Sequence, residues 1–278
     1  MLIEPLLRHV DVMNRNERFS YSSWLLARFL FKIRPALLAD ALKRLLRVRR
    51  RTIDTNAGKF WIDPVSTLGM TLMREGTYEP GMRSILATFL GPGKVFVDLG
   101  ANEGYFTVLG ARLTRPEGRV IAIEPQDRLV PIISTNLRQN NLMATIVKTA
   151  ISDRRGTTVL HLAPSTNPGS SGLHRATKYP VPKQPVRTLT LADVLDDNQV
   201  GVVDLLKVDI EGFEFEAILG SPHLFTEKRI KAMALELHPA ALTARGKSVE
   251  ELGAFLTGAG YSAKTIGGHT VWTAETAH

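Results

Sequence analysis

The chain of 278 residues contains no cysteine, which excludes disulfide bonds, thiolate metal sites and cysteine nucleophiles. It also lacks the run of about 18 apolar residues that a membrane-spanning helix needs: the longest candidate, 24–33, is interrupted by Arg28 and Lys32. The N-terminal residues show neither the basic start nor the uninterrupted apolar stretch of a signal peptide, so a cytoplasmic protein is expected. With 44% hydrophobic and 22% charged residues, the composition is that of a folded globular protein.

The net charge of +8 comes from one segment, residues 28–51, which holds nine lysines and arginines against the single acid Asp40. The remaining chain has 26 bases and 26 acids, so the total charge does not indicate a nucleic-acid partner. Apolar residues recur at helical spacing over 24–46, and Pro35 divides them into two predicted helices with basic outer faces. Three interpretations stay open: packing on the domain with a solvated basic side, weak contact with an anionic membrane, or contact with an acidic substrate or nucleic acid.

From residue 80 onward, short apolar runs alternate with helical patterns, as is typical of a parallel sheet covered by helices on both faces. The pattern predicts strands over 95–100, 119–125, 145–151, 202–210 and 230–238, helices over 105–113, 127–140, 213–219 and 249–259, and a closing hairpin over 261–273. The proline-rich stretch 156–186 predicts a loop or flap that begins with a strand. Upstream, the pattern predicts a hairpin over 51–64 and a helix over 67–74.

A glycine loop links the first of these strands to its helix: Asp98 is followed by Gly100, Asn102 and Gly104. Glycines at this place let a ligand approach the backbone, and a helix N-terminus offers unpaired N–H groups. The loop departs from the dinucleotide fingerprint, because Asn102 stands where that fingerprint has glycine. Glu124 ends the next strand, where a carboxylate can accept hydrogen bonds from both hydroxyls of a ribose. Together these residues predict a nucleotide-like pocket.

A second group of charged residues, Lys207, Asp209, Glu211 and Glu214, stands at the end of the predicted strand 202–210. Strand alternation places the first three on one side if the strand continues that far. Such a group can hold a substrate hydroxyl, ionise it, bind a divalent cation, or simply form a salt bridge, and the sequence does not choose among these.

Glu236 and His238 close the following strand, 230–238. A hydroxyl is a poor nucleophile near neutral pH, and histidine is the commonest side chain that removes its proton. His238 is therefore a candidate general base, with a purely structural histidine as the alternative, and in the base role the rate is expected to rise through a pKa near ~6.5.

The sequence resembles the FkbM-type methyltransferases, which belong to the S-adenosylmethionine-dependent enzymes. The resemblance is carried by GTYEP (76–80), VFVDLGANEGYFTVL (95–109), AIEP (122–125), NLRQNN (136–141), AISDRRG (150–156), VRTLTLADVL (186–195), DLLKVDIEGFEFEAILG (204–220) and ALELHP (234–239). The sequence departs from the family at Thr190, where an aspartate is usual, and a threonine there can still cap the following helix.

The resemblance implies a class I methyltransferase fold, a Rossmann-like, doubly wound, mostly parallel seven-stranded sheet over 76–278. A basic helical extension and hairpin would precede it over 1–75. The implied cofactor is S-adenosylmethionine. Its amino-acid and sulfonium end would lie on Asp98 and the loop of Gly100, Asn102 and Gly104, its ribose on Glu124, and its adenine on Ser152 and Asp153. Asp153 has a competing interpretation as a turn former.

The activity implied is transfer of a methyl group to a hydroxyl oxygen of a sugar, glycan or natural product. Its catalytic residues would be Asp209, His238, Lys207 and Glu211, with a divalent cation left open and the flap shaping the acceptor site. A rival enzyme, a nucleotide-sugar or NAD-dependent oxidoreductase, is disfavoured by Asn102. A rival of another class is a non-catalytic module that binds an anionic membrane or nucleic acid through 28–51.

Overall fold

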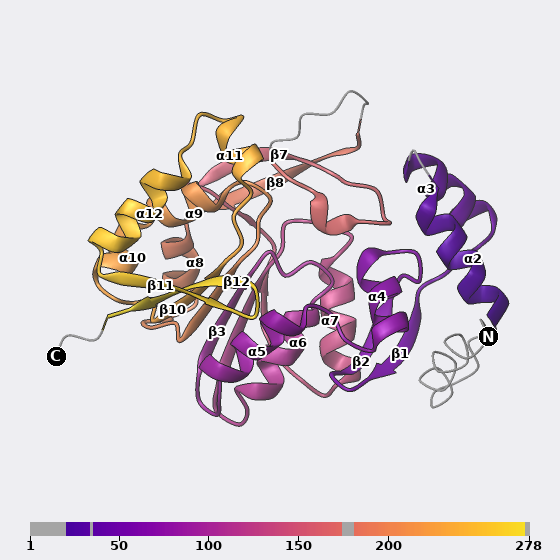
Figure 1. Ribbon diagram of the computed structural model, residues 1–278, viewed down its shortest axis with the longest axis horizontal. Coiled ribbons are helices and arrows are strands. Elements are labelled where there is room, and N and C mark those ends of the chain that lie inside the picture. Colours follow the sequence, from indigo (N-terminus) through magenta and orange to yellow (C-terminus); the bar gives the residue numbers. More distant parts are fainter. Residues whose placement is uncertain (1–20, 34–35, 174–180, 276–278) are drawn as a thin grey trace, which may run out of the picture. The chain divides into compact units, whose positions relative to one another are not determined.

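The computed structural model describes residues 21–33, 36–173 and 181–275 (Figure 1). They divide into two compact units. Unit 1 consists of Met1–Tyr78 with Pro164–Pro168, and unit 2 of Glu79–Ala163 with Gly169–His278. Within the described ranges, no helix combines the length and the apolar character needed to cross a membrane.

Unit 1 contains the predicted pair of helices, the hairpin and a further helix. Their bounds are α2 (Tyr21–Lys32), α3 (Ala36–Leu45), β1 (Arg51–Thr55), β2 (Gly58–Ile62) and α4 (Thr67–Glu75). The break predicted at Pro35 falls outside the described residues. Ala27, Leu30 and Val65 form one apolar cluster of this unit. Phe60, Ile62, Leu68 and Leu72 are buried as well. The sequence prediction for this part is confirmed element by element.

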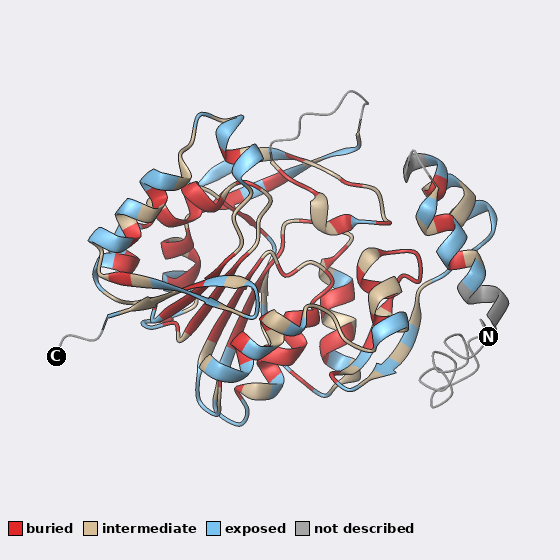
Figure 2. Ribbon diagram, in the orientation of Figure 1, coloured by how far each residue is buried: buried red, intermediate tan, exposed pale blue. Residues whose placement is uncertain are grey.

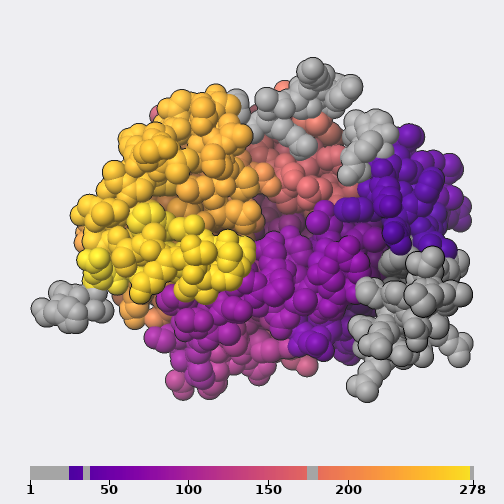
Figure 3. Space-filling model, in the orientation of Figure 1, coloured from indigo at the N-terminus to yellow at the C-terminus, as the bar shows by residue number. Residues whose placement is uncertain are grey.

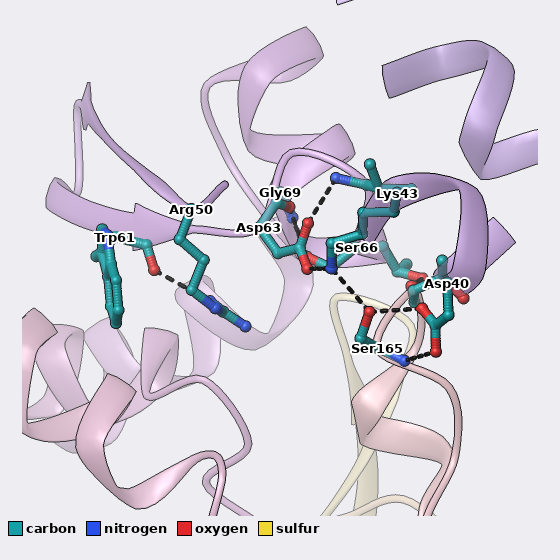
Figure 4. Close-up of polar contacts among 11 residues, drawn as sticks. Asp40, Lys43, Arg50, Trp61, Asp63, Ser66, Gly69 and Ser165 are labelled. Atoms are coloured by element: carbon teal, nitrogen blue, oxygen red, sulfur yellow. Dashed lines mark hydrogen bonds and ion pairs between the residues drawn. The ribbon is translucent and has the colours of Figure 1, made fainter. Parts of the chain in front are cut away.

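Polar contacts connect α3 with the residues after β2 and with the segment Pro164–Pro168 (Figure 4). The ammonium group of Lys43 pairs with buried Asp63 and donates to the Ser165 hydroxyl at 2.7 Å. The carboxylate of Asp40 accepts the Ser165 N–H at 3.1 Å and its hydroxyl at 2.6 Å. Ser66 caps α4 by accepting the Gly69 N–H at 3.0 Å. These contacts add to the apolar packing of unit 1 and connect three of its segments.

Unit 2 is built on a seven-stranded sheet in the order β11-β12-β10-β9-β3-β4-β5. Its strands are β3 (Val95–Leu99), β4 (Arg119–Ile123), β5 (Thr145–Val147), β9 (Leu205–Val208), β10 (Ala232–Leu235), β11 (Tyr261–Ile266) and β12 (His269–Ala274). The five neighbouring strands β10, β9, β3, β4 and β5 are parallel, and β12 is antiparallel to both of its neighbours, β10 and β11. This confirms the predicted doubly wound, mostly parallel sheet.

Helices cover both faces of this sheet (Figure 1). One layer consists of α5 (Pro80–Phe89), α6 (Tyr105–Leu113) and α7 (Val130–Gln139), and the other of α8 (Leu191–Asp197), α9 (Glu214–Leu219), α10 (Pro222–Thr226) and α12 (Val249–Gly258). A short helix, α11 (Pro239–Thr243), follows β10. Because both faces are covered, the central strands β3, β4, β9 and β10 are largely buried and the outer sides of the helices are exposed (Figure 2).

The start and the end of unit 2 lie side by side on one face, where the purple surface of α5 adjoins the yellow surface of the C-terminal hairpin (Figure 3). A Cβ atom on Gly81 would come within 1.9 Å of the Gly267 carbonyl oxygen. Gly81 and Gly267 therefore permit a backbone contact that a larger residue at either position would block.

Three sequence predictions are corrected. The single strand expected over 145–151 is two strands, because the chain bends at Thr149, whose hydroxyl donates to the Arg187 carbonyl at 2.9 Å. After the bend, β6 (Ala150–Ile151) pairs with β8 (Lys183–Leu189) in a second sheet that also holds β7 (Gly156–His161). The flap expected over 156–186 therefore contains two antiparallel strands. The predicted strands 202–210 and 230–238 end earlier, at Val208 and Leu235.

Candidate active site

The glycine loop after β3 is shaped by close backbone contacts. Gly100 has φ +84°, and a Cβ atom there would lie 1.9 Å from the Asp209 carbonyl oxygen. Gly104, with φ +81°, precedes α6 and lies against Ile133, where a Cβ atom would meet side-chain and backbone atoms at 3.1 and 3.2 Å. Both positions favour glycine because an L side chain would be strained at positive φ, and at Gly100 it would also collide with the Asp209 carbonyl. Asn102 between them also has positive φ, at 51°.

Glu124 follows β4 and is bonded to the glycine loop. Its Oε2 accepts the Asn102 N–H at 2.8 Å, and its Oε1 accepts the Gln126 N–H at 3.0 Å. Burial raises the pKa of Glu124 to about 7, against these two backbone hydrogen bonds, which act to lower it. Each carboxylate oxygen has a second lone pair, so the group can still accept hydrogen bonds from a diol.

A cleft that opens to solvent runs beside these residues. It is lined by Leu99, Gly100, Asn102, Ile123, Glu124, Pro125, Gln126, Thr149, Ala150, Ile151, Leu160, Gly169, Ser171, Gly172, Leu173, Asp209, Ile210, Glu211 and Phe213. The structure thus brings five predicted site residues to one cleft: Gly100, Asn102, Glu124, Asp209 and Glu211. Its wall combines apolar side chains with converging polar groups, as is typical of a small-molecule site.

The residues present fit S-adenosylmethionine. Leu99, Ile123 and Ile151 offer an apolar surface for a base, and Glu124 offers acceptors for a ribose. In the described part of the chain, the side-chain oxygen of Asn102 is buried without a hydrogen-bond partner, and the ammonium group of the cofactor's amino-acid end is a donor that would satisfy it. Gly100 lines the cleft as well, so its backbone borders the ligand space.

Asp98 and Lys207 lie behind this cleft rather than in its lining. Asp98 is fully buried, accepts the Thr107 hydroxyl at 2.6 Å and lies 3.6 Å from the Lys207 ammonium. Burial raises the pKa of Asp98. Lys207 donates to the Gly100 carbonyl at 3.3 Å. Burial alone would lower its pKa, but the carboxylates of Asp209 and Asp98 raise it, so the ammonium stays charged. Both side chains support the loop instead of touching the cleft.

Ser152 and Asp153, predicted to contact adenine, are not brought to the cleft. Its wall at this point is formed by Thr149, Ala150 and Ile151. The Asp153 carboxylate is about half exposed and pairs with its neighbour Arg154 at 3.2 Å. The bend at Thr149 is the reason, since it carries the chain into the second sheet before Ser152 is reached.

The strand-end group is assembled by a turn rather than by strand alternation. β9 ends at Val208, and the chain then turns through Glu211 and Gly212, with φ of 54° and 99°. Asp209 Oδ2 lies 3.5 Å from the Lys207 ammonium, and Glu211 Oε2 lies 3.7 Å from His238 Nε2. Burial raises the pKa of Glu211, and the nearby Asp209 carboxylate acts in the same direction.

His238 is positioned by Glu214, which the sequence placed in the strand-end group but did not connect with His238. The Glu214 carboxylate is fully buried, and its Oε1 lies 2.9 Å from His238 Nδ1 and accepts the Gly212 N–H at 2.9 Å. The hydrogen bond to Glu214 raises the pKa of His238 to about 9, although burial opposes the shift. The value near 6.5 expected for His238 is therefore wrong, because that value belongs to an imidazole without a carboxylate partner.

Two further residues complete the site. Glu79, next to Pro80 at the start of α5, has φ 42°, and its charge acts on both Lys207 and Glu236. The only sequence signal for it was its place in GTYEP (76–80).

Arg245 pairs with Glu216, donates to the Gly212 carbonyl and stacks 3.6 Å from the Phe213 ring centre. No sequence pattern marks Arg245, because its partners are about thirty residues away in the chain.

The helix cap predicted at Thr190 is present. The Thr190 hydroxyl accepts the Asp193 N–H at 3.0 Å, and the Asp193 carboxylate accepts the Thr190 N–H at 3.0 Å. This reciprocal pair is a capping box that starts α8.

Residues 98–263, more than half of the chain, match the model of the methyltransferase FkbM domain, and the chain belongs to this family. The match confirms the resemblance and the cofactor implied by it, S-adenosylmethionine. A curated relative, methyltransferase sdnD of Sordaria araneosa, is 29% identical over 154 residues. These residues are 45% of this chain and 59% of sdnD, so the match spans less than two thirds of that protein's length.

Solved structures with a similar arrangement include methyltransferase FkbM from Methylobacillus flagellatus KT, at 15% identity and a TM-score of 0.43 over 86% of this chain and 60% of that one. Fibrillarin from Aeropyrum pernix, with natively bound S-adenosyl-L-methionine, has 15% identity and a TM-score of 0.37 over 80% of this chain and 81% of its own. The fold assignment stands on the strand order of the sheet itself.

Proposed function

We propose that this chain transfers a methyl group from S-adenosylmethionine to a hydroxyl oxygen of a sugar, glycan or natural product. The observation that carries the proposal is that one cleft joins the glycine loop and Glu124 with the carboxylates of Asp209 and Glu211. The methyl donor would occupy the part beside Gly100 and Glu124, and the acceptor the part beside Asp209.

The charge of the acceptor side favours a hydroxyl. Asp209, Glu211 and Glu236 are acidic, and Glu79 adds its charge to theirs. Such a mouth accepts hydrogen bonds from hydroxyl groups and repels phosphates, which disfavours nucleic acid as the acceptor. S-adenosylmethionine, when bound, supplies a methyl group activated by its sulfonium charge.

Within the chain, Asp209 would orient the acceptor hydroxyl and Lys207 would hold Asp209 in place from behind. The acceptor oxygen forms a bond to the methyl carbon as the carbon–sulfur bond breaks, and the hydroxyl proton leaves to a carboxylate or to water. With only the carboxylates of Glu214, Glu211 and Asp209 around it, His238 is protonated near neutral pH. The chain therefore relies on positioning more than on this imidazole as a base.

The test is incubation of the purified chain with methyl-labelled S-adenosylmethionine and panels of sugars, glycans and natural-product extracts. We expect label in an alkali-stable methyl ether. Asp209→Asn should lower turnover by roughly 10²-fold or more and leave affinity for S-adenosylhomocysteine within a few fold. Glu227→Gln, an exposed acid outside the site, is the control and should match wild type. Label in an alkali-labile ester, or binding of NAD in place of S-adenosylhomocysteine, would contradict the proposal.

We further propose that the basic helices of unit 1 give the chain a weak contact with anionic membrane surfaces. Large apolar side chains are exposed on α2 and α3 and just after them, at Leu25, Phe29, Leu38, Leu45 and Leu46. They alternate with the lysines and arginines of 28–51, a combination suited to a helix pair that lies in a lipid interface.

A further inference from the structure

The ends of β9 and β10 place two carboxylates at the same level of the sheet. The strands are parallel neighbours in which Val208 is paired with Leu235, and the Glu236 N–H donates to the Val208 carbonyl at 2.9 Å. Asp209 and Glu236 are each the first residue after these paired ends. Both therefore leave the sheet side by side at its carboxyl edge.

His238 joins this pair from the turn between β10 and α11. One ligand atom from each of Asp209, Glu236 and His238 can be chosen so that all three lie within 4.8 Å of one another. Neighbouring ligand atoms around a tetrahedral metal ion are roughly 3.4 Å apart. Side-chain shifts of less than 1 Å, well within rotamer freedom, would therefore bring all three to one ion.

Glu214 gives His238 the orientation that a metal ligand needs. It holds Nδ1 at 2.9 Å, and Nε2 then lies 3.9 Å from Asp209 Oδ1. A metal-binding histidine commonly donates its other ring N–H to a carboxylate, which fixes the tautomer and strengthens the ligand. Because Glu214 is fully buried and also accepts the Gly212 N–H, its position is set by the fold.

The charges around the three residues favour a cation among them. Glu211 lies 3.7 Å from His238 Nε2, and the negative charges of Glu79 and Asp209 both act on Glu236. Lys207 balances one of these charges, at 3.5 Å from Asp209. A divalent ion would compensate carboxylates that otherwise repel one another.

We propose that Asp209, Glu236 and His238 bind a divalent transition-metal ion of the type of Mn²⁺ or Zn²⁺. The imidazole nitrogen favours such an ion over Mg²⁺ or Ca²⁺, which prefer oxygen ligands alone. Asp209 also lines the cleft, so an ion held there can take the acceptor hydroxyl as a further ligand and ease the loss of its proton. The role in catalysis rests on the proposed function, whereas the binding of the ion does not.

The experiment is calorimetric titration of the chelator-treated full chain with MnCl₂, ZnCl₂, MgCl₂ and CaCl₂. We expect one Mn²⁺ or Zn²⁺ per chain and at least tenfold weaker binding of Mg²⁺ and Ca²⁺. Glu236→Gln and His238→Asn should weaken Mn²⁺ binding by at least tenfold, and Glu214→Gln by roughly 10- to 100-fold. The exposed control Glu227→Gln should bind as wild type. Binding unchanged in these variants, no binding of either transition metal, or preference for Mg²⁺ would overturn the proposal.

A spectroscopic measurement on the unaltered chain covers the case in which a variant fails to fold. Pulsed electron paramagnetic resonance of bound Mn²⁺ should show coupling to an imidazole nitrogen, and its absence would overturn the site. Titration with S-adenosylhomocysteine in the same metal-free preparation separates the two proposals. Cofactor binding without metal binding would contradict only the metal site. Metal binding without cofactor binding would contradict only the proposed function.

Discussion

Glu124 has a buried carboxylate whose protonation state controls what it can bind. Burial raises its pKa to about 7, so near neutral pH the group is divided between the acid and the carboxylate. The carboxylate can accept hydrogen bonds from both hydroxyls of a ribose, whereas the protonated acid presents a donor to one of them. Cofactor binding should therefore favour the ionised form.

The prediction at the residue scale is that affinity for S-adenosylhomocysteine rises with pH by up to roughly tenfold between pH 6 and pH 8, because the ionised fraction rises by about that factor around a pKa of 7. Calorimetry across this range measures it, and in Glu124→Gln the pH dependence should disappear along with much of the affinity. A Glu124→Gln profile as steep as wild type would assign the titration to another group.

The same pKa shift makes the stability of the folded chain depend on pH. The pKa of Glu124 is higher in the folded chain than in the unfolded chain, so its protonated form favours folding below about pH 4.5. This contribution to the free energy of unfolding is lost as pH rises through about 7. Without ligand, Glu124→Gln should gain stability relative to wild type as the pH passes from 5 to 8, and urea unfolding at both values checks the sign.

At the scale of elements, the turn from β3 into α6 depends on a backbone contact with the turn after β9. Gly100 and Gly93 both have positive φ, 84° and 78°, but a Cβ atom on Gly100 would meet the Asp209 carbonyl at 1.9 Å and one on Gly93 would meet nothing within 4 Å. The pair thus separates backbone strain from collision.

We expect Gly93→Ala to lower the free energy of unfolding by about 1 kcal/mol, because alanine is strained at positive φ. Gly100→Ala should cost a further 1–3 kcal/mol or so, because it also forces two backbone segments apart. It should also weaken S-adenosylhomocysteine binding, which Gly93→Ala should leave unchanged. Urea unfolding and calorimetry measure the two effects. Equal costs for both variants would show that the loop relaxes around the added methyl group.

At the scale of the whole molecule, positive charge is concentrated in residues 28–51, and the rest of the chain is balanced. We expect sedimentation with vesicles containing phosphatidylserine, little with neutral vesicles, and loss of binding when salt is raised to about 0.5 M. Replacing the exposed Lys32, Arg44 and Arg47 by Gln should abolish the binding. Replacing the exposed Lys148, Arg187 and Lys264 removes the same charge elsewhere and should not. Equal loss in both triple variants would indicate a nonspecific effect of net charge.

The sequence by itself determined the elements and the class of fold. Buried strands such as β3 and amphipathic helices such as α6 have local signatures, because the spacing of apolar residues follows directly from the repeat of the backbone. The glycine loop and Glu124 were predictable for a similar reason. Gly100 and Gly104 have positive φ, a local backbone conformation that favours glycine. An acid at the end of the neighbouring parallel strand reaches the same edge of the sheet.

Only the tertiary structure decided which side chains touch. Local pattern does not reveal that the chain changes sheets at Thr149, which takes Asp153 away from the cleft, because strand pairing joins distant segments. It also does not show that Glu214 holds His238 and raises its pKa to about 9. The ionisation of a buried group depends on distances of a few ångströms to residues far apart in the chain, and the folded packing alone sets those distances.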